Sequence, residues 1–441
     1  MSLRRFLWLA APALATLGMF VAALAVGLHR YPAGTISQPA GPDAALVARG
    51  AYLARLGDCA GCHTAPQGGA PYAGGLGLGS PFGSIVTTNI TPDRRHGIGR
   101  YTLADFDRAL RRGIAPGGKR LYPAMPYASF SKLGDDDVRA LYAYLMLAVA
   151  PVARPAPPSD VAFPFNQRWA LGLWQLAFVP VQAYVPRSDR DARWNRGAYL
   201  VQSLGHCGSC HTPRGPAYQE LGYDERSPRW LTGGVNDHWF APNLTGDPGA
   251  GLGRVDTTTL VEFLRTGHGG GLSAFGSMVA QVEDSSQYLS PDDAAAIAAY
   301  LKSLPARRPS GGFTPGGPST AQRYGNRLSD ALTQGAQVYR SACARCHGED
   351  GAGAPPAFPR LAGNPAVIGE DTTSLIRLVV EGGNSPRTES GPPRAAMPGF
   401  ASTLTDTQIA AALTWIRSAW GNDALPVTGN DVSSLREKLH K

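Results

Sequence analysis

The sequence predicts a mainly α-helical, loop-rich protein of three tandem domains. One five-residue motif occurs three times, and a segment with helical periodicity closes the region after each copy. The 441 residues suit about three domains of roughly 100–200 residues each. The 54 glycines, the 37 prolines and a charged fraction of only 17% favour long irregular loops around apolar interiors.

The repeated motif is Cys-x-x-Cys-His, and its three copies use all six cysteines of the chain. It is the signature of c-type haem attachment, in which two thiols form thioethers with the haem and the histidine binds the iron. The sequence therefore predicts three covalently bound haem c groups. The predicted attachment residues are Cys59, Cys62, Cys207, Cys210, Cys343 and Cys346, and the predicted iron ligands are His63, His211 and His347.

Other uses of cysteine fit the pattern poorly. No thiol remains for a disulfide framework, and no βαβ pattern surrounds a motif as a thioredoxin-like site would require. A zinc site needs two cysteine pairs or a histidine pair close together in the sequence. The motifs begin at residues 59, 207 and 343, which places them 148 and 136 residues apart.

Composition divides the chain into domains and connectors. Residues 148–160 are rich in Pro and Ala, and residues 305–330 are rich in Gly, Pro and Ser, which is typical of loops. The predicted order is a signal peptide or membrane anchor at 1–30, a first domain at 43–150, a linker with an apolar aromatic segment at 151–190, a second domain at 191–305, a Gly/Pro-rich linker at 306–329, a third domain at 330–421 and a C-terminal tail at 422–441.

The N-terminus predicts export. Arg4 and Arg5 precede an apolar run at residues 6–28, which places the N-terminus in the cytoplasm by the positive-inside rule. The run is long for a signal-peptide core and sufficient for a membrane-spanning helix. Residues 23–25 form an Ala-x-Ala cleavage candidate, so a cleaved signal and a retained anchor both fit.

The first two predicted domains repeat short segments. The pattern Arg-Gly-Ala-Tyr-Leu occurs at residues 49–53 and 196–200, ahead of the first two motifs. An Asn-x-Thr element follows each of these motifs, at residues 89–91 and 243–245. The third copy is more distant and lacks this element.

Each predicted domain ends in a helix, at residues 135–147, 291–304 and 406–420. Ser290 is a candidate N-cap before Pro291, and residues 405–408 form a capping box. The first two domains also contain helical stretches at residues 101–112 and 256–265. Gly50, Gly197 and Gly335 would let the first helix of each domain cross the last one closely, an arrangement typical of class I cytochrome c folds.

Residues 163–184 form an apolar segment that contains Trp169 and Trp174 and almost no charge. One interpretation is a short helix packed between domains. The other is a surface patch that faces a partner or the bilayer interface, where Trp is favoured.

Methionine supplies the sixth iron ligand in many c-type haem sites and raises the reduction potential. Among the six methionines, Met125, Met278 and Met397 each lie between one motif and its closing helix. Met125 and Met397 precede a proline, which favours an extended backbone. Met278 lacks this proline, so His268 or His238 remain alternatives in the second domain.

The sequence contains no nucleophile elbow, no P-loop and no dinucleotide fingerprint, so it predicts no substrate-oxidising site of its own. The net charge of +8 and the pI of about 9.2 favour contact with anionic headgroups or an acidic partner. No nucleic-acid-binding motif accompanies the basic charge.

With these motifs the sequence resembles the tri-haem cytochrome c subunit of bacterial membrane-bound, quinone-reducing dehydrogenases, which serve alcohol, gluconate, sorbitol and fructose oxidation. The resemblance spans residues 43–439. Its specific elements lie at residues 88–93, 121–127, 163–168, 241–245, 275–278, 397–400 and 430–436.

The resemblance implies that Met125, Met278 and Met397 are axial ligands. It also implies a separate catalytic subunit with FAD or pyrroloquinoline quinone (PQQ), ubiquinone as electron acceptor, and a position on the periplasmic face of the inner membrane. Three alternatives keep the haems and change the role: a cytochrome subunit of a molybdenum hydroxylase that oxidises aldehydes or N-heterocycles, a free-standing electron carrier, and a haem enzyme with an open distal site.

Overall fold

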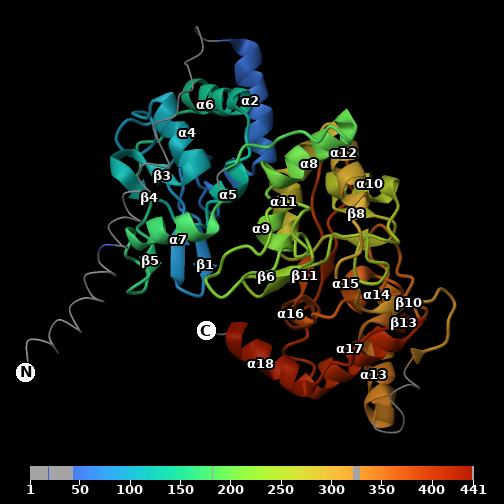
Figure 1. The fold of residues 1–441 in the computed structure, drawn as a ribbon. Helices are drawn as coiled ribbons and strands as arrows, with labels where there is room; N and C mark the ends of the chain where they lie inside the picture. The colour runs from blue at the N-terminus through green and yellow to red at the C-terminus, as the bar shows by residue number, and fades with distance from the viewer. Residues whose placement is uncertain (1–17, 19–42, 181, 321–327, 440–441) are drawn as a thin grey trace, which may run out of the picture. The chain divides into compact units, whose positions relative to one another are not determined.

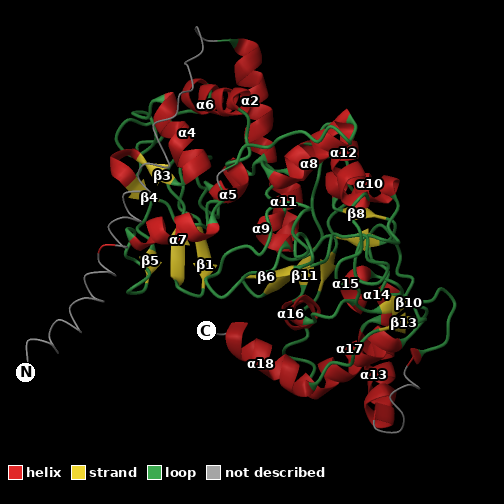
Figure 2. Ribbon diagram, in the orientation of Figure 1, coloured by secondary structure: helices red, strands yellow, loops and turns green. Residues whose placement is uncertain are grey.

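The computed structural model describes residues 18, 43–180, 182–320 and 328–439 (Figure 1). Helices and loops make up most of these residues and the strands are short (Figure 2), which confirms the predicted mainly α-helical class. The predicted signal peptide or anchor at 1–30 lies outside the described residues, apart from Gly18. Within the described ranges, no helix is long and apolar enough to cross a membrane.

The described chain divides into two compact units. The first contains residues 43–54 and 62–184, and the second contains residues 55–61 and the chain from Val185 onward. The second and third predicted domains therefore pack within one unit.

The first unit holds the elements that follow the first motif. Helices α2 (Ala44–Leu56) and α3 (Cys59–Cys62) lead into it and include residues of both units. The sheet has the antiparallel order β1-β2-β5, and β3 and β4 form a separate hairpin. The remaining elements are β1 (Gly77–Ser80), β2 (Gly83–Val86), α4 (Leu103–Arg112), β3 (Ile114–Ala115), η1 (Pro116–Gly118), β4 (Lys119–Arg120), α5 (Tyr127–Phe130), α6 (Asp135–Leu147), β5 (Asp160–Val161) and α7 (Ala170–Phe178).

The second unit contains the other two motifs, and its strands form two-stranded antiparallel pairs: β6 with β7, β8 with β9, β10 with β13, and β11 with β12. Its helices are α8 (Ala192–Gln202), α9 (Gly208–His211), α10 (Thr257–Thr266), α11 (Ser277–Asp284), η2 (Ser286–Tyr288), α12 (Pro291–Lys302), α13 (Ser329–Ala342), α14 (Ala344–His347), α15 (Pro365–Ile368), α16 (Thr373–Glu381), α17 (Asp406–Ser418) and α18 (Gly429–Leu439). Its strands are β6 (Gly234–Asn236), β7 (Trp239–Ala241), β8 (His268–Gly269), β9 (Leu272–Ser273), β10 (Gly312–Phe313), β11 (Gly383–Asn384), β12 (Ala396–Met397) and β13 (Asn422–Asp423).

One close helix crossing recurs three times: α2 with α6, α8 with α12, and α13 with α17. The predicted role of the small residues is confirmed, because a glycine of the first helix lies against a backbone carbonyl of the last. A Cβ atom on Gly50, Gly197 or Gly335 would lie 1.9, 1.9 or 2.2 Å from the carbonyl oxygen of Ala140, Ala296 or Ala411, respectively. Only glycine permits helices to approach this closely.

An ion pair stands beside the crossing in the first two copies. Arg49 binds Asp137 at 2.5 Å, and Arg196 binds both oxygens of Asp293 at 2.7 and 2.8 Å. The corresponding residue of the third copy is Gln408, which completes the predicted capping box at the start of α17. The third copy therefore uses a local cap where the first two use a contact between helices.

The predicted helices are present, and their ends differ by a few residues. Ser290 caps α12 as predicted, but the helix ends at Lys302 because the residue before Pro305 is disfavoured in helical conformation. Helix α17 ends at Ser418 because the backbone of Ala419 is extended, and Trp420 and Gly421 then continue with positive φ. The predicted tail contains α18, whose Val432 and Leu435 are buried in a core with α16 and α17.

Candidate haem sites

Each Cys-x-x-Cys-His motif lies at a single helical turn, in α3, α9 and α14. In a helical turn, residues three apart lie on the same face, so the two thiols of a motif face the same side. None of the six cysteines is in a disulfide, and all are partly or fully exposed. The motif turn can therefore present two thiols and an imidazole to one ligand.

The imidazole of each motif is oriented by a backbone carbonyl. Nδ1 lies 2.6 Å from the Thr88 oxygen in His63, 2.7 Å from the Pro242 oxygen in His211 and 2.9 Å from the Pro359 oxygen in His347. A carbonyl oxygen only accepts hydrogen bonds, so Nδ1 carries the proton and the lone pair of Nε2 remains available to a metal. Burial lowers the pKa of all three imidazoles, which favours the neutral form that binds iron.

A second hydrogen bond holds the backbone of each motif histidine. The carbonyl oxygens of His63, His211 and His347 accept the N–H of Gly74, Gly233 and Gly353 at 2.7, 2.8 and 2.9 Å, respectively. All three glycines have positive φ, which other residues adopt at a cost. Sequence reasoning missed these glycines, because nothing distinguishes them among 54.

The Asn-x-Thr element holds the acceptor carbonyl at the first motif. Thr88, whose oxygen binds the His63 ring, directly precedes Asn89. The Asn89 side chain donates to the carbonyl oxygens of Val152 and Arg154 at 2.8 and 3.0 Å. The segment after the closing helix thus fixes the position of the carbonyl that accepts from His63. The sequence repeat marked the Asn-x-Thr element but did not indicate this role.

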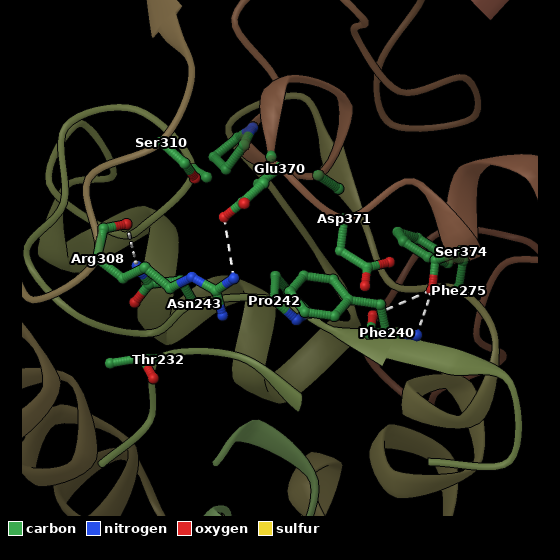
Figure 3. Close-up of a pocket in the computed structure, with 14 residues that line it drawn as sticks. Thr232, Phe240, Pro242, Asn243, Phe275, Arg308, Ser310, Glu370, Asp371 and Ser374 are labelled. Carbon is green, nitrogen blue, oxygen red and sulfur yellow. Dashed lines mark hydrogen bonds and ion pairs between the residues drawn. The ribbon is translucent and has the colours of Figure 1, made fainter. Parts of the chain in front are cut away.

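The second motif repeats this arrangement. Pro242 precedes Asn243, whose Oδ1 accepts the N–H of Thr245 at 2.8 Å. The Asn243 amide donates toward the Arg308 carbonyl at 3.5 Å, again in the segment after the closing helix (Figure 3).

The third motif obtains the same support from another part of the chain. Asn422, just after α17, accepts the N–H of Gly363 at 2.7 Å and donates to the Leu361 carbonyl at 3.2 Å. Both residues follow Pro359, the acceptor for His347. The asparagine and the acceptor have exchanged places relative to the first two copies.

The three candidate sixth ligands occupy different local structures. Met125 lies just before α5, Met278 is the second residue of α11, and Met397 is in β12, where it pairs with Gly383. All three are partly buried. Paired thiols, a neutral imidazole protonated at Nδ1 and a downstream thioether fit a covalently bound haem c in each region.

Comparison with known proteins follows this geometry. A family model described as cytochrome c matches residues 47–148 and 332–420, which include the first and third motifs. The cytochrome c subunit of alcohol dehydrogenase (quinone) from Gluconacetobacter polyoxogenes is 47% identical over 92% of this chain and 87% of the relative. The chain belongs to the cytochrome c subunits of quinone-dependent dehydrogenases. As a member of this family, it binds haem c.

Two further relatives are also similar to this cytochrome c subunit. The gluconate 2-dehydrogenase cytochrome c subunit of Pantoea cypripedii is 44% identical over 89% of this chain and 90% of the relative. One of the subunits of nicotinate dehydrogenase from Pseudomonas putida is 38% identical over 92% of this chain, which corresponds to 33% of that longer protein.

The alternative ligands His268 and His238 lie in different surroundings within the cytochrome c subunit. His268, in β8, is 2% exposed, and neither ring nitrogen has a hydrogen-bond partner among the described residues. Its ring lies near the carbonyls of Pro356 and Pro386, in segments that follow the third motif, and burial lowers its pKa. His238 is exposed in the turn between β6 and β7. His206 is half-buried beside Cys207.

A pocket of the cytochrome c subunit lies between segments that follow the second and third motifs (Figure 3). Phe240 and Phe275 line it, and Arg308 binds Glu370 across it at 2.9 Å. The Ser374 hydroxyl contacts both the N–H and the carbonyl oxygen of Phe240, at 2.8 and 3.0 Å. These bonds join α16 to β7, the strand that directly precedes Pro242, whose carbonyl oxygen accepts from His211.

Proposed function

We propose that this chain carries three haem c groups and relays electrons from a separate dehydrogenase subunit to ubiquinone in the membrane. The recurring contact between each motif histidine and a backbone carbonyl is the observation that carries the proposal. When bound, haem c supplies a one-electron carrier whose potential depends on its axial ligands and surroundings. The proposed thioether residues are Cys59, Cys62, Cys207, Cys210, Cys343 and Cys346, and the proposed proximal ligands are His63, His211 and His347.

The chain's own residues hold each haem and tune it. The hydrogen bond from Nδ1 to a backbone carbonyl oxygen makes the imidazole a better electron donor, which stabilises ferric iron. A methionine thioether that also bound the iron would act in the other direction and would exclude water and small ligands. Met125, Met278 and Met397 are the proposed sixth ligands, and the position of His268 beside segments of the third region supports Met278 over His268.

Three class I cytochrome c-like domains are the proposed organisation, with boundaries near residues 43–150, 191–305 and 330–421. The close helix crossing at a glycine, which recurs three times, supports this division. It includes the second region, which the family model does not cover.

The proposed partner is a dehydrogenase catalytic subunit that contains FAD or PQQ and oxidises an alcohol, sugar or sugar acid. The names of the alcohol and gluconate relatives support it. The nicotinate relative supports a second candidate, an electron-accepting cytochrome for an N-heterocycle dehydrogenase. The proposed location is the periplasmic face of the inner membrane.

Purification of the full chain from gently solubilised membranes tests this proposal. We expect three haems per chain by haemochrome absorbance and a co-eluting dehydrogenase whose substrate reduces all three. A flavin- or PQQ-containing partner supports the leading proposal, and a molybdenum-containing partner supports the second candidate. Three haems with no partner in any preparation would contradict both and leave a free-standing carrier.

The segment at residues 163–178 supports membrane contact, because its large apolar side chains are exposed or only partly buried. In α7 the buried residues are Gly172 and Gln175, and Gln175 binds Arg120 at 2.5 Å. Phe163 and Trp169 are 78% and 54% exposed. Aromatic side chains of this kind favour the bilayer interface.

The charge of this segment also favours a lipid surface. Between residues 161 and 186 only Arg168 is charged, and it donates to the Arg120 carbonyl and lies over the Tyr122 ring. No carboxylate there opposes an anionic headgroup.

Replacing Phe163 and Trp169 together by serine is expected to weaken binding to anionic phospholipid vesicles by about tenfold or more, because each large apolar side chain contributes roughly 1.5–3 kcal/mol on burial. Co-sedimentation of the haem-loaded protein measures this change. Leu425→Ser is the matched control, since Leu425 is 62% exposed in the second unit. Equal vesicle binding by the double variant and the control would rule out this segment as the docking surface.

A further inference from the structure

Helix α11 links the proposed sixth ligand of one haem to the segment that carries the sixth ligand of another. Met278 is its second residue, and Glu283 is in its last turn. Glu283 contacts the loop that precedes Met397.

That loop is the connection between β11 and β12. Its neck is closed by two hydrogen bonds, from Ser385 N–H to the Ala395 carbonyl and from Ala395 N–H to the Ser385 hydroxyl, both 2.9 Å. Beyond the neck, Met397 pairs with Gly383 in the two-stranded ladder. The strand that carries Met397 therefore leads directly out of this loop.

Glu283 holds both arms of the loop with one oxygen. Its Oε1 accepts the Arg387 backbone N–H at 2.6 Å on the first arm and forms an ion pair with Arg394 on the second. The Glu283 side chain is 25% exposed, so solvent screens this contact less than a typical surface ion pair. Bonds to a charged acceptor are stronger than neutral ones.

Other contacts seat the same loop on the second region. Gln287 accepts the N–H of Glu389 at 3.1 Å. Pro386 packs against Gly267, where a Cβ atom would lie 2.4 Å from the proline ring. These contacts place the loop against the C-cap of α10, the last turn of α11 and η2, all in the second region.

We propose that Glu283 is a positioning residue for Met397, so that a side chain of the second region sets the reduction potential of the third haem. This inference rests on the proposed ligation by Met397. Arg394 is three residues before Met397, so its ion pair with Glu283 adds to the ladder and the Ser385–Ala395 bonds that hold the strand presenting the thioether. A sixth ligand binds only in the fraction of molecules in which its strand is in place.

Glu283→Ala tests the proposal in the haem-loaded full chain. Met397→Leu first identifies which of the three one-electron steps in a potentiometric titration belongs to the third haem. Glu283→Ala is then expected to lower the potential of that same step and to weaken the red charge-transfer band of methionine-ligated ferric haem. Loss of bonds to a charged acceptor should raise the detached fraction of Met397 about tenfold or more. Glu283→Gln, which keeps an acceptor for Arg387, should give a smaller change.

Controls separate this effect from general damage. Gln281→Ala lies on the same helix and should leave all three potentials unchanged. Arg394→Gln should reproduce the Glu283→Gln shift, and the double variant should add little to either. An unchanged third step in Glu283→Ala, when Met397→Leu does shift it, overturns the positioning role and leaves the proposed function intact. No shift in Met397→Leu itself would overturn the proposed ligation by Met397 and, with it, the positioning role of Glu283.

Discussion

Replacing Met125, Met278 or Met397 by leucine is expected to open one iron at a time to carbon monoxide. Leucine has nearly the volume of methionine and lacks the sulfur, so the packing should survive while the thioether bond is lost. Each variant should bind carbon monoxide at about a third of its haem, since the chain has three motifs. The potential of that haem should fall on the order of 0.1 V, within the span of about 0.8 V that axial ligands cover.

Met146→Leu is the matched control for this series. Met146 is a partly buried residue of α6 with no proposed role at iron, so the variant should bind no carbon monoxide when reduced. The second region gives the sharpest test. If Met278→Leu leaves all three irons closed and His268→Leu opens one, then His268 is the ligand and the assignment of Met278 is wrong.

Local patterns in the sequence were sufficient to predict the three motifs and the helices that recur around them. The Cys-x-x-Cys-His motif and the capping residues Ser290 and Thr405 are signals that act within one or two helical turns. Gly197 and its equivalents were recognisable because their position relative to the motif repeats. Such features depend on neighbours in the chain and are therefore visible without a structure.

The supports of the motif histidines could not be predicted in the same way. The acceptors at Thr88, Pro242 and Pro359 are backbone carbonyls, which no side-chain pattern reveals. Asn422 supports the third site from the segment after the closing helix α17, so the absence of an Asn-x-Thr element beside the acceptor was misleading.

Contacts between segments that are distant in the sequence could not be predicted from local sequence patterns either. Glu283 meets Arg394 across 111 residues, and nothing in the local sequence of either residue signals the other. In α7 the apolar run left a packed helix and a surface patch both open, and the residues that the helix buries fully are Gly172 and Gln175. Periodicity identifies a helix and leaves open which face its surroundings cover.

Gly197→Ala is expected to destabilise the second unit by about 2–3 kcal/mol, although alanine ordinarily favours a helix over glycine by about 1 kcal/mol. The added methyl carbon would lie 1.9 Å from the Ala296 oxygen and 2.5 Å from its carbonyl carbon. Because both contacts are with backbone, relief requires α8 and α12 to separate. That separation strains the Arg196–Asp293 ion pair beside the crossing.

Thermal unfolding of the haem-loaded protein, followed by circular dichroism, measures this loss as a lower midpoint. The matched control is Gly429→Ala in the first turn of α18, where a Cβ atom would lie 3.7 Å from its nearest neighbour, the Thr407 hydroxyl. Its midpoint should stay unchanged or rise, because only the helix preference acts there. If Gly197→Ala also left the midpoint unchanged, the helices would have room to part. Close contact at this crossing would then contribute little to the stability of the fold.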